Sequence, residues 1–211
     1  MSDLIINQHM FRLIFKFKSR LEMSQAKTIS TEEFNRLLLR LGRSRNAVRN
    51  QTMIYITHWS GMRVGEIASL KIKDVINKDG SIKSEVHLAS SQTKGNSSRS
   101  VMVPKKLQDA LLKYTATLWT TNLERSLFIS ARTGQGFTSN SLGNLMKSFY
   151  VNAGIDNGSS HSGRRTFITT LARKGVSARV LQSLAGHKHL GTTQRYIDIN
   201  DEMRQEAAEL I

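Results

Sequence analysis

The sequence predicts a mainly α-helical fold with one small three-stranded antiparallel sheet, placing the chain in the α+β class. Apolar residues recur at helical spacing over most of the chain. Strand-like patterning is confined to residues 74–103, apart from one short run near residue 128. Hydrophobic residues make up 39% of the 211 residues, which is enough for one sizeable core or two small ones.

Three helices are predicted in the first third of the chain. Ser30-Thr31-Glu32-Glu33 has the pattern of a capping box, which opens the first helix. The apolar positions of that helix are Phe34, Leu37, Leu38 and Leu41. A polar, basic link over 42–45 leads to a second helix over 46–60, and a third helix starts near Arg63.

The predicted sheet follows these helices. Residues 74–76 and 84–89 pattern as two strands around the Asp79-Gly80 turn, and residues 99–103 form the third strand after a polar loop. Pro104, the only proline, can open a helix over 105–119. The remaining predicted elements are a short strand at 127–129 and helices over 139–153, 161–174, 177–186, 189–198 and 201–210.

Charge and composition restrict the class of partner. Lys and Arg total 31 against 16 Asp and Glu, a formal charge of +15, which favours a polyanionic partner. No apolar run approaches the ~20 residues of a membrane span. Cysteine is absent, which excludes disulfides, thiolate catalysis and cysteine-bound zinc, and fits a reducing cytosol. Nucleic acid is therefore the favoured partner.

The C-terminal fifty residues carry a candidate reactive set. His161, Arg164, His187 and Tyr196 follow one another there. Cutting a phosphodiester requires a nucleophile, charge stabilisation at the non-bridging oxygens and a proton for the leaving oxygen. A tyrosine phenol can be the nucleophile, and planar guanidinium groups can each grip two phosphate oxygens.

Four stretches of sequence resemble the tyrosine recombinases, the phage integrase family. Residues 57–70, which include Ser60-Gly61-Met62-Arg63 and Glu66, resemble that family's first arginine box. Thr93-Lys94-Gly95, followed by residues 99–104, resembles its catalytic-lysine hairpin. Residues 161–167 resemble its His-x-x-Arg box, and residues 184–196 resemble its closing Gly-His and tyrosine segment. The resemblance covers roughly residues 28–205 and implies the catalytic-domain fold of this family.

The resemblance also implies a role for each matching residue. Arg63 and Arg164 would clamp the scissile phosphate, and Lys94 would be the general acid for the 5′ oxygen. His161 would handle the proton of the nucleophile, His187 would hydrogen-bond a non-bridging oxygen, and Tyr196 would form a 3′-phosphotyrosyl bond. Glu66 would support the geometry of the site. The family uses neither a metal nor another cofactor.

The chain departs from the family pattern at three positions, and it is shorter than most members of the family. Ser162 and Gly163 replace an acidic residue and a leucine, and Ala185 replaces a leucine. With Gly163, either the helix starts later or the backbone approaches a neighbour closely. Residues 1–27 form a basic and apolar extension, interpreted as an element that packs on the main body and not as a signal peptide. The resemblance implies that residues 28–200 form the catalytic domain, and the chain is similar to the short recombinases that invert fimbrial promoters. Residues 201–211 are predicted to form a helix that either caps the core or docks on a neighbouring subunit.

Five further arginines are predicted to contact DNA: Arg43, Arg45, Arg49, Arg99 and Arg165. The expected partner is double-stranded DNA with inverted-repeat sites, bound by a homotetramer, with no membrane partner, in the bacterial cytoplasm at the nucleoid. The expected outcome is integration, excision or inversion of a DNA segment. Two alternatives remain open: a relaxase similar to type IB topoisomerases, and a DNA-binding accessory protein that does not cut.

Overall fold

The structure is a computed structural model that describes residues 26–93, 96–197 and 208–209. The predicted N-terminal extension and the predicted helix over 201–210 therefore fall almost wholly outside the described residues, as does Lys94. The described elements are, in chain order, α2 (Thr31–Gly42), α3 (Ala47–Ser60), α4 (Val64–Ser69), α5 (Ile72–Val75), β1 (Glu85–Leu88), the 3-10 turn η1 (Ser90–Gln92), β2 (Arg99–Met102), α6 (Lys105–Thr115), α7 (Ser139–Asn152), α8 (Ser162–Arg173), α9 (Ala178–Ala185) and α10 (Leu190–Gln194).

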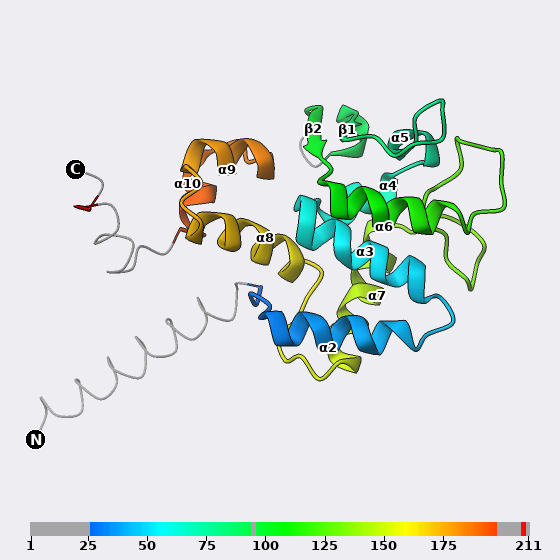
Figure 1. Cartoon of the computed structure of the whole chain (residues 1–211), viewed down its shortest axis with the longest axis horizontal. Helices are drawn as coiled ribbons and strands as arrows, with labels where there is room; N and C mark the ends of the chain where they lie inside the picture. Colours follow the sequence, from blue (N-terminus) through cyan, green and yellow to red (C-terminus); the bar gives the residue numbers. More distant parts are fainter. Residues whose placement is uncertain (1–25, 94–95, 198–207, 210–211) are drawn as a thin grey trace, which may run out of the picture.

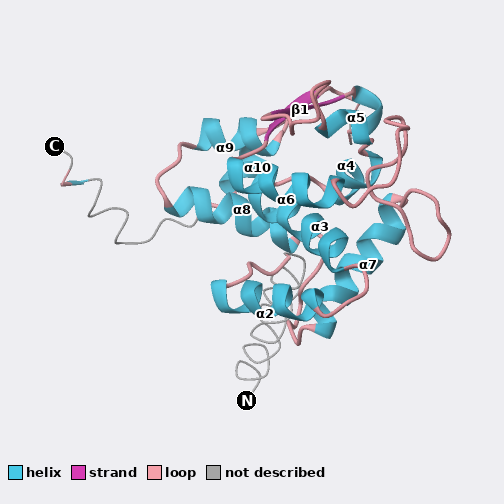
Figure 2. Ribbon diagram, turned by 45° about the vertical axis from the view of Figure 1, so that its right-hand side comes forward, coloured by secondary structure: helices cyan, strands magenta, loops and turns pink. Residues whose placement is uncertain are grey.

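Helix α3 is the centre of the fold. It packs against α2, α6 and α8, while α4 packs against α7. Figure 1 shows β1, β2 and α5 at one edge of this helical body, and α8, α9 and α10 on the opposite side from the loops that follow α6. The α-helices far outweigh the single small sheet (Figure 2). The prediction of a mainly helical α+β fold is confirmed.

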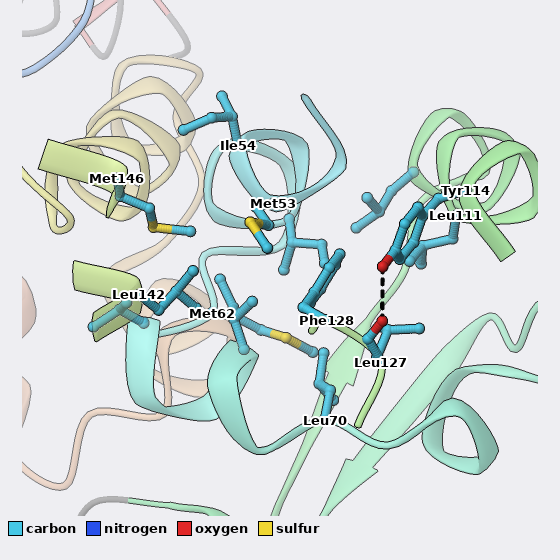
Figure 3. Close-up of a cluster of buried hydrophobic side chains, with 14 of the residues drawn as sticks. Met53, Ile54, Met62, Leu70, Leu111, Tyr114, Leu127, Phe128, Leu142 and Met146 are labelled. Atoms are coloured by element: carbon cyan, nitrogen blue, oxygen red, sulfur yellow. Dashed lines mark hydrogen bonds between the residues drawn. The ribbon is translucent and has the colours of Figure 1, made fainter. Parts of the chain in front are cut away.

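The hydrophobic core lies between these helices and the loop over 127–129. Met53 and Ile54 of α3, Met62, Leu142 and Met146 converge there (Figure 3). Phe128 stacks on Tyr114 of α6 with ring centroids 5.0 Å apart. The Tyr114 hydroxyl donates to the Leu127 carbonyl at 2.8 Å, so its polar atom is satisfied inside the core.

The predicted capping box at Ser30 is present. Ser30 Oγ accepts from the Glu33 backbone N–H at 3.2 Å, and Glu33 Oε2 accepts from the Ser30 N–H at 3.1 Å. These reciprocal bonds satisfy two donors that a helix N-terminus leaves without partners. They fix the start of α2 and leave Leu37 and Leu41 to face the core.

The strand predicted over residues 74–76 is wrong. In the described part of the chain the sheet has two strands, β1 and β2, with Glu85 opposite Met102 and Leu88 opposite Arg99. Asp74 accepts from the Lys71 N–H at 2.8 Å and so caps a short helix, α5, where the strand over 74–76 was expected. An isolated bridge between Ile76 and Ile82 is what remains of the expected hairpin.

Residues 127–129 likewise do not form the predicted strand; isolated bridges join Lys71 to Ser126 and Ile129 to Gly136. Helices α6 and α10 end four residues earlier than predicted, at Thr115 and Gln194. No helix among the described residues is both long and apolar enough to cross a membrane.

Candidate active site

The turn between α3 and α4 places Arg63. Gly61 ends α3 in the left-handed region at φ 66°, and a Cβ there would stand 2.5 Å from the Phe167 ring, so the turn requires glycine. Arg63 then takes an extended conformation as the N-cap residue of α4. Its Nη1 donates to Glu66 Oε1 and its Nη2 donates to the Gly186 carbonyl, both at 3.0 Å.

Glu66 is the buried centre of the ion pairs around Arg63. Its side chain is 1% exposed and accepts from the Arg63 N–H at 2.7 Å and from Arg63 Nη1. Arg99 binds the same carboxylate with two further bonds, from Nε at 3.0 Å and from Nη2 at 2.7 Å. Burial alone would raise the pKa of Glu66, but the bonds and charges of Arg99 and Arg63 hold this pKa below its usual value. The carboxylate therefore stays ionised at neutral pH.

Arg164 lies on α8 in the same cluster. Its guanidinium is buried and donates to two carbonyls, that of Gly61 at 2.6 Å and that of Ala185 at 2.7 Å. Burial, followed by the positive charges of Arg63 and Arg99, lowers the pKa of Arg164 to about 9, so it stays protonated at neutral pH. Three arginines against one carboxylate leave a net charge of 3 − 1 = +2 in this cluster. That excess suits a phosphate.

Gly163 explains how α8 reaches α3. A Cβ at Gly163 would stand 2.1 Å from Thr57 Oγ1 and 2.6 Å from His58 Nδ1 of α3. Of the two expectations for this glycine, the close backbone approach is therefore the one that the structure bears out. Because α8 begins at Ser162, the approach sets the position of Arg164 one residue later.

His187 follows α9 and faces the arginines. Gly186 caps α9 in the left-handed region at φ 61°, and the His187 N–H donates to the Gln182 carbonyl at 3.0 Å. Burial, then the charges of Arg164 and Arg63, lowers the pKa of His187 to about 4, so the ring is neutral at pH 7. Its Nδ1 lies 2.9 Å from Thr193 Oγ1, and in the tautomer in which Thr193 donates to Nδ1, the ring carries its proton on Nε2.

Tyr196 lies two residues beyond α10, half-buried against His187. The two rings stack with centroids 5.8 Å apart, and the Tyr196 N–H donates to the Thr193 carbonyl at 2.9 Å. Arg165 places its guanidinium 5.5 Å from the centre of the tyrosine ring. Arg164 and Tyr196 also interact electrostatically. The structure thus brings Tyr196 to the arginine cluster from a segment 133 residues away from Arg63.

Two of the predicted residues are less closely tied to this cluster. His161 is exposed at the N-cap of α8, three residues before Arg164 and therefore on a neighbouring part of the same helix surface. Lys94 lies outside the described residues. Among its described neighbours, Thr93 Oγ1 donates to the Ser97 carbonyl at 2.7 Å. Strand β2 begins at Arg99, whose side chain binds the buried Glu66.

The five arginines predicted to touch DNA separate into two groups. Arg43 and Arg45 are exposed in the link between α2 and α3. The other three, Arg49, Arg99 and Arg165, have partners inside the protein. Arg49 donates to the Ile129 carbonyl at 2.7 Å and to Asn50, so it fastens α3 to the core loop, and the expectation of a DNA contact does not suit it. Arg165 donates to Thr28 Oγ1 at 3.2 Å besides its contact with Tyr196.

Arg99 differs most from expectation, because the sequence suggested a DNA contact and the structure pairs it with buried Glu66. Thr193, which the sequence marked only as part of a motif, is fully buried and contacts the ring of His187. Within the described ranges, no three His, Asp or Glu side chains gather as a set that could hold a metal ion.

Comparison with known proteins gives the family and the fold. The model of the phage integrase family matches residues 27–203. The tyrosine recombinase XerA of Pyrococcus furiosus is 25% identical over 185 residues, covering 87% of this chain and 61% of XerA. A crystal structure of XerA recombinase superposes with a TM-score of 0.68 at 28% identity, covering 87% of this chain and 64% of that one.

A Tn1549 transposon integrase in complex with transposon right end DNA shares the fold, with a TM-score of 0.68 at 16% identity, covering 88% of this chain and 66% of that one. The chain thus spans about three fifths of the length of XerA. With the family model matched over 177 residues and the arginines, histidine and tyrosine of its boxes gathered in one site, the chain belongs to the phage integrase family of tyrosine recombinases.

Proposed function

We propose that this chain is the catalytic part of a site-specific DNA recombinase that cleaves and rejoins duplex DNA through a 3′-phosphotyrosyl intermediate. The observation that carries the proposal is the single cluster of Arg63, Arg164, His187 and Tyr196, which has excess positive charge and a half-buried phenol. The XerA relatives and the DNA complex of the Tn1549 integrase support the same reaction class.

In the proposed cleavage step, the Tyr196 hydroxyl attacks the scissile phosphorus and the bond to the 5′ oxygen breaks. The 3′ phosphate stays on the tyrosine, and the 5′ oxygen leaves as a hydroxyl. Arg63 and Arg164 stabilise the charge that builds on the non-bridging oxygens. Both guanidiniums are held by backbone carbonyls, so they are oriented before the phosphate arrives.

The proton transfers are assigned to histidine and lysine. We assign His161 to accept the proton of Tyr196, and Lys94 to donate the proton to the leaving 5′ oxygen. A neutral His187 donates from Nε2 to a non-bridging oxygen. The phosphotyrosyl bond keeps the energy of the cleaved ester, so the 5′ hydroxyl of another strand can attack it and complete the exchange. The step balances without a metal or a nucleotide.

The proposed substrate is duplex DNA with inverted-repeat sites, bound by four copies of the chain at the bacterial nucleoid. Arg43 and Arg45 lie exposed where they can contact the phosphate backbone. The predicted tail over 201–211 has four acidic residues and one arginine, so its charge opposes that of the rest of the chain. We assign this tail to a neighbouring subunit in the tetramer.

Covalent capture tests the chemistry. Sheared chromosomal DNA of the source cell is mixed with the protein, quenched in detergent, and the protein-linked fragments are sequenced to identify the site. Nicked duplexes carrying that site should then accumulate adduct with the unsubstituted chain and none with Tyr196→Phe. The matched control is Tyr55→Phe, which removes a hydroxyl from a ring stacked on Trp59 at 4.2 Å and leaves the site intact.

Three other results discriminate the alternatives. Adduct that persists in Tyr196→Phe would refute the assignment of the nucleophile. Relaxation of supercoiled plasmid that lacks the captured site would identify a topoisomerase-like relaxase. DNA binding without adduct from the unsubstituted chain would identify a non-cutting accessory protein. Binding itself should weaken steeply as salt rises, because Lys and Arg release counterions from the phosphates they contact. A flat salt response would contradict binding through the DNA phosphates.

A further inference from the structure

Arg99 makes more contacts within the site than a surface arginine needs. Two of its nitrogens bind both oxygens of Glu66, at 3.0 and 2.7 Å, and Nη1 donates to the Leu184 carbonyl at 3.2 Å. Its side chain is 11% exposed. The parallel pair of bonds to one carboxylate is the geometry that fixes both groups in orientation as well as in distance.

The carboxylate that Arg99 fixes is the same one that orients Arg63. Arg63 contributes one side-chain bond to Glu66, at 3.0 Å, whereas Arg99 contributes two. Without Arg99, Glu66 would keep a buried negative charge with half of its guanidinium partners missing, which favours a rotated or protonated carboxyl. Either change alters the support under Arg63.

The C-terminal end of α9 gives Arg99 a second set of contacts. Leu184, Ala185 and Gly186 are consecutive, and their carbonyls accept from Arg99, Arg164 and Arg63 respectively. A helix C-terminus leaves such carbonyls without helical partners and carries partial negative charge, so three guanidiniums can satisfy and neutralise it. Arg99 also lies against the backbone of Gly186, where a Cβ would stand 2.6 Å from Arg99 Cδ.

Arg99 therefore contacts two separate parts of the split site. Its carboxylate partner lies one turn after Arg63, and its carbonyl partner lies three residues before His187. We infer that Arg99 is a positioning residue that holds Arg63 and the His187 segment in one arrangement for cleavage, and that it does not bind DNA phosphate. This inference rests on the proposed function, because its measure is the cleavage rate.

The test compares cleavage with binding in the full chain. Arg99→Gln and Arg99→Lys are assayed for single-turnover adduct formation on the captured nicked duplex at saturating protein, and for affinity and salt dependence in a Tyr196→Phe background. We expect Arg99→Gln to slow adduct formation by about 100-fold, since a misplacement of ~1 Å at a reacting group costs that much. Affinity should stay within about threefold, and the salt dependence should not change.

Arg99→Lys separates loss of positioning from loss of folding, because lysine keeps the positive charge beside Glu66 but cannot supply two parallel hydrogen bonds. It should remain folded by thermal melting and cut about tenfold more slowly than the unsubstituted chain, the order expected when a supporting bond to a reacting group is lost. The matched control is Arg36→Gln, which removes an arginine that donates to the carbonyls of Ala153 and Gly154, away from the cluster. Arg36→Gln should lower the melting temperature and leave the adduct rate unchanged.

The outcomes separate the two levels of the proposal. If the unsubstituted chain forms no adduct, the proposed function fails and the role of Arg99 fails with it. If it forms adduct and folded Arg99→Lys and Arg99→Gln match its rate, the positioning role alone is refuted. A uniform loss of affinity with a salt slope smaller by about one would instead identify Arg99 as a phosphate contact and overturn the inference.

Discussion

Replacing Gly163 with alanine should loosen the junction between α3 and α8. The new Cβ would stand 2.1 Å from Thr57 Oγ1, 2.6 Å from His58 Nδ1 and 2.7 Å from Thr57 Cβ, distances that no packed carbon tolerates. Neither neighbour can rotate away freely. Thr57 is buried and donates to the Ile54 carbonyl at 2.8 Å, and His58 Nδ1 lies 3.0 Å from the same carbonyl. The helices must therefore separate.

The expected magnitude follows from two opposing effects. Overpacking a close helix contact costs about 1–3 kcal/mol. Alanine in place of glycine inside a helix returns up to ~1 kcal/mol. The clash at Gly163 puts the cost toward the upper end of that range, at about 2–3 kcal/mol. The net loss of unfolding free energy should therefore be about 1–2 kcal/mol, which in a chain of this size lowers the melting temperature by about 2–8 °C. Because Arg164 follows Gly163 directly and donates to the Gly61 carbonyl, adduct formation should slow as well.

Gly143→Ala is the matched control for this substitution. Gly143 also lies inside a helix, α7, but a Cβ there would meet Ser160 at 3.8 Å, an ordinary contact distance. This variant should gain about 0.5–1 kcal/mol from helix propensity. Thermal and urea unfolding of the three proteins checks both signs. A Gly163→Ala protein as stable as the unsubstituted chain would refute the close approach of α8 to α3.

Three other substitutions probe the site and its support. Burial lowers the pKa of His58 to about 4 from a usual 6.5. Between these pH values His58 is protonated in the unfolded chain but not in the folded one, so stability falls as pH drops from 6.5 to 4, by roughly 3 kcal/mol. His58→Asn should abolish this loss in urea unfolding across the same pH range, and an unchanged pH profile would contradict the burial of His58. Glu66→Gln should lower the melting temperature at pH 7, where the buried arginines lose their counter-charge. Because folding lowers the pKa of Glu66, its ionised carboxylate stabilises the fold above the usual glutamate pKa, and this stabilisation disappears as pH falls through the pKa of the folded state. The difference in stability between Glu66→Gln and the unsubstituted chain should therefore shrink in acid. A difference that stays constant with pH would argue against an ionised Glu66. Gly186→Ala combines backbone strain at φ 61° with a new Cβ that would stand 2.6 Å from Arg99. It should slow adduct formation more than the control Gly175→Ala, because Gly175 is also left-handed but has open space around it. Equal rates would contradict a specific contact with Arg99.

The sequence was sufficient where structure follows from neighbours along the chain. The capping box at Ser30 and the glycine end of α3 are local hydrogen-bond and backbone requirements, so a short motif predicts them. The strand expected at 74–76 failed for a local reason of the same kind. The Asp74 side chain caps the Lys71 N–H three residues earlier, and this bond starts a helical turn before any strand can pair.

Long-range pairs limited the prediction of the site. The resemblance pointed to the candidate site residues, and the structure brings Arg63, Arg164, His187 and Tyr196 together. The resemblance could not identify the hydrogen-bond partners of the arginines, since Arg99 binds a carboxylate 33 residues away and Arg49 binds a carbonyl 80 residues away. In sequence both resemble the exposed arginines of a DNA-binding surface. Only the folded chain distinguishes a guanidinium that faces solvent from one that has already used its donors.

The end of α9 shows why arginine suits this site better than lysine. Arg63, Arg99 and Arg164 each donate at least one hydrogen bond to a carbonyl of residues 184–186. Arg63 and Arg99 also donate to Glu66. A guanidinium has five N–H donors in a fixed plane, so Arg164 can hold Gly61 and Ala185 and still present nitrogen to a phosphate. A lysine ammonium has three donors and no plane, and would have to choose between holding the fold and holding the substrate. The bonds that stabilise the folded site are therefore the same bonds that orient the arginines proposed to bind the phosphate.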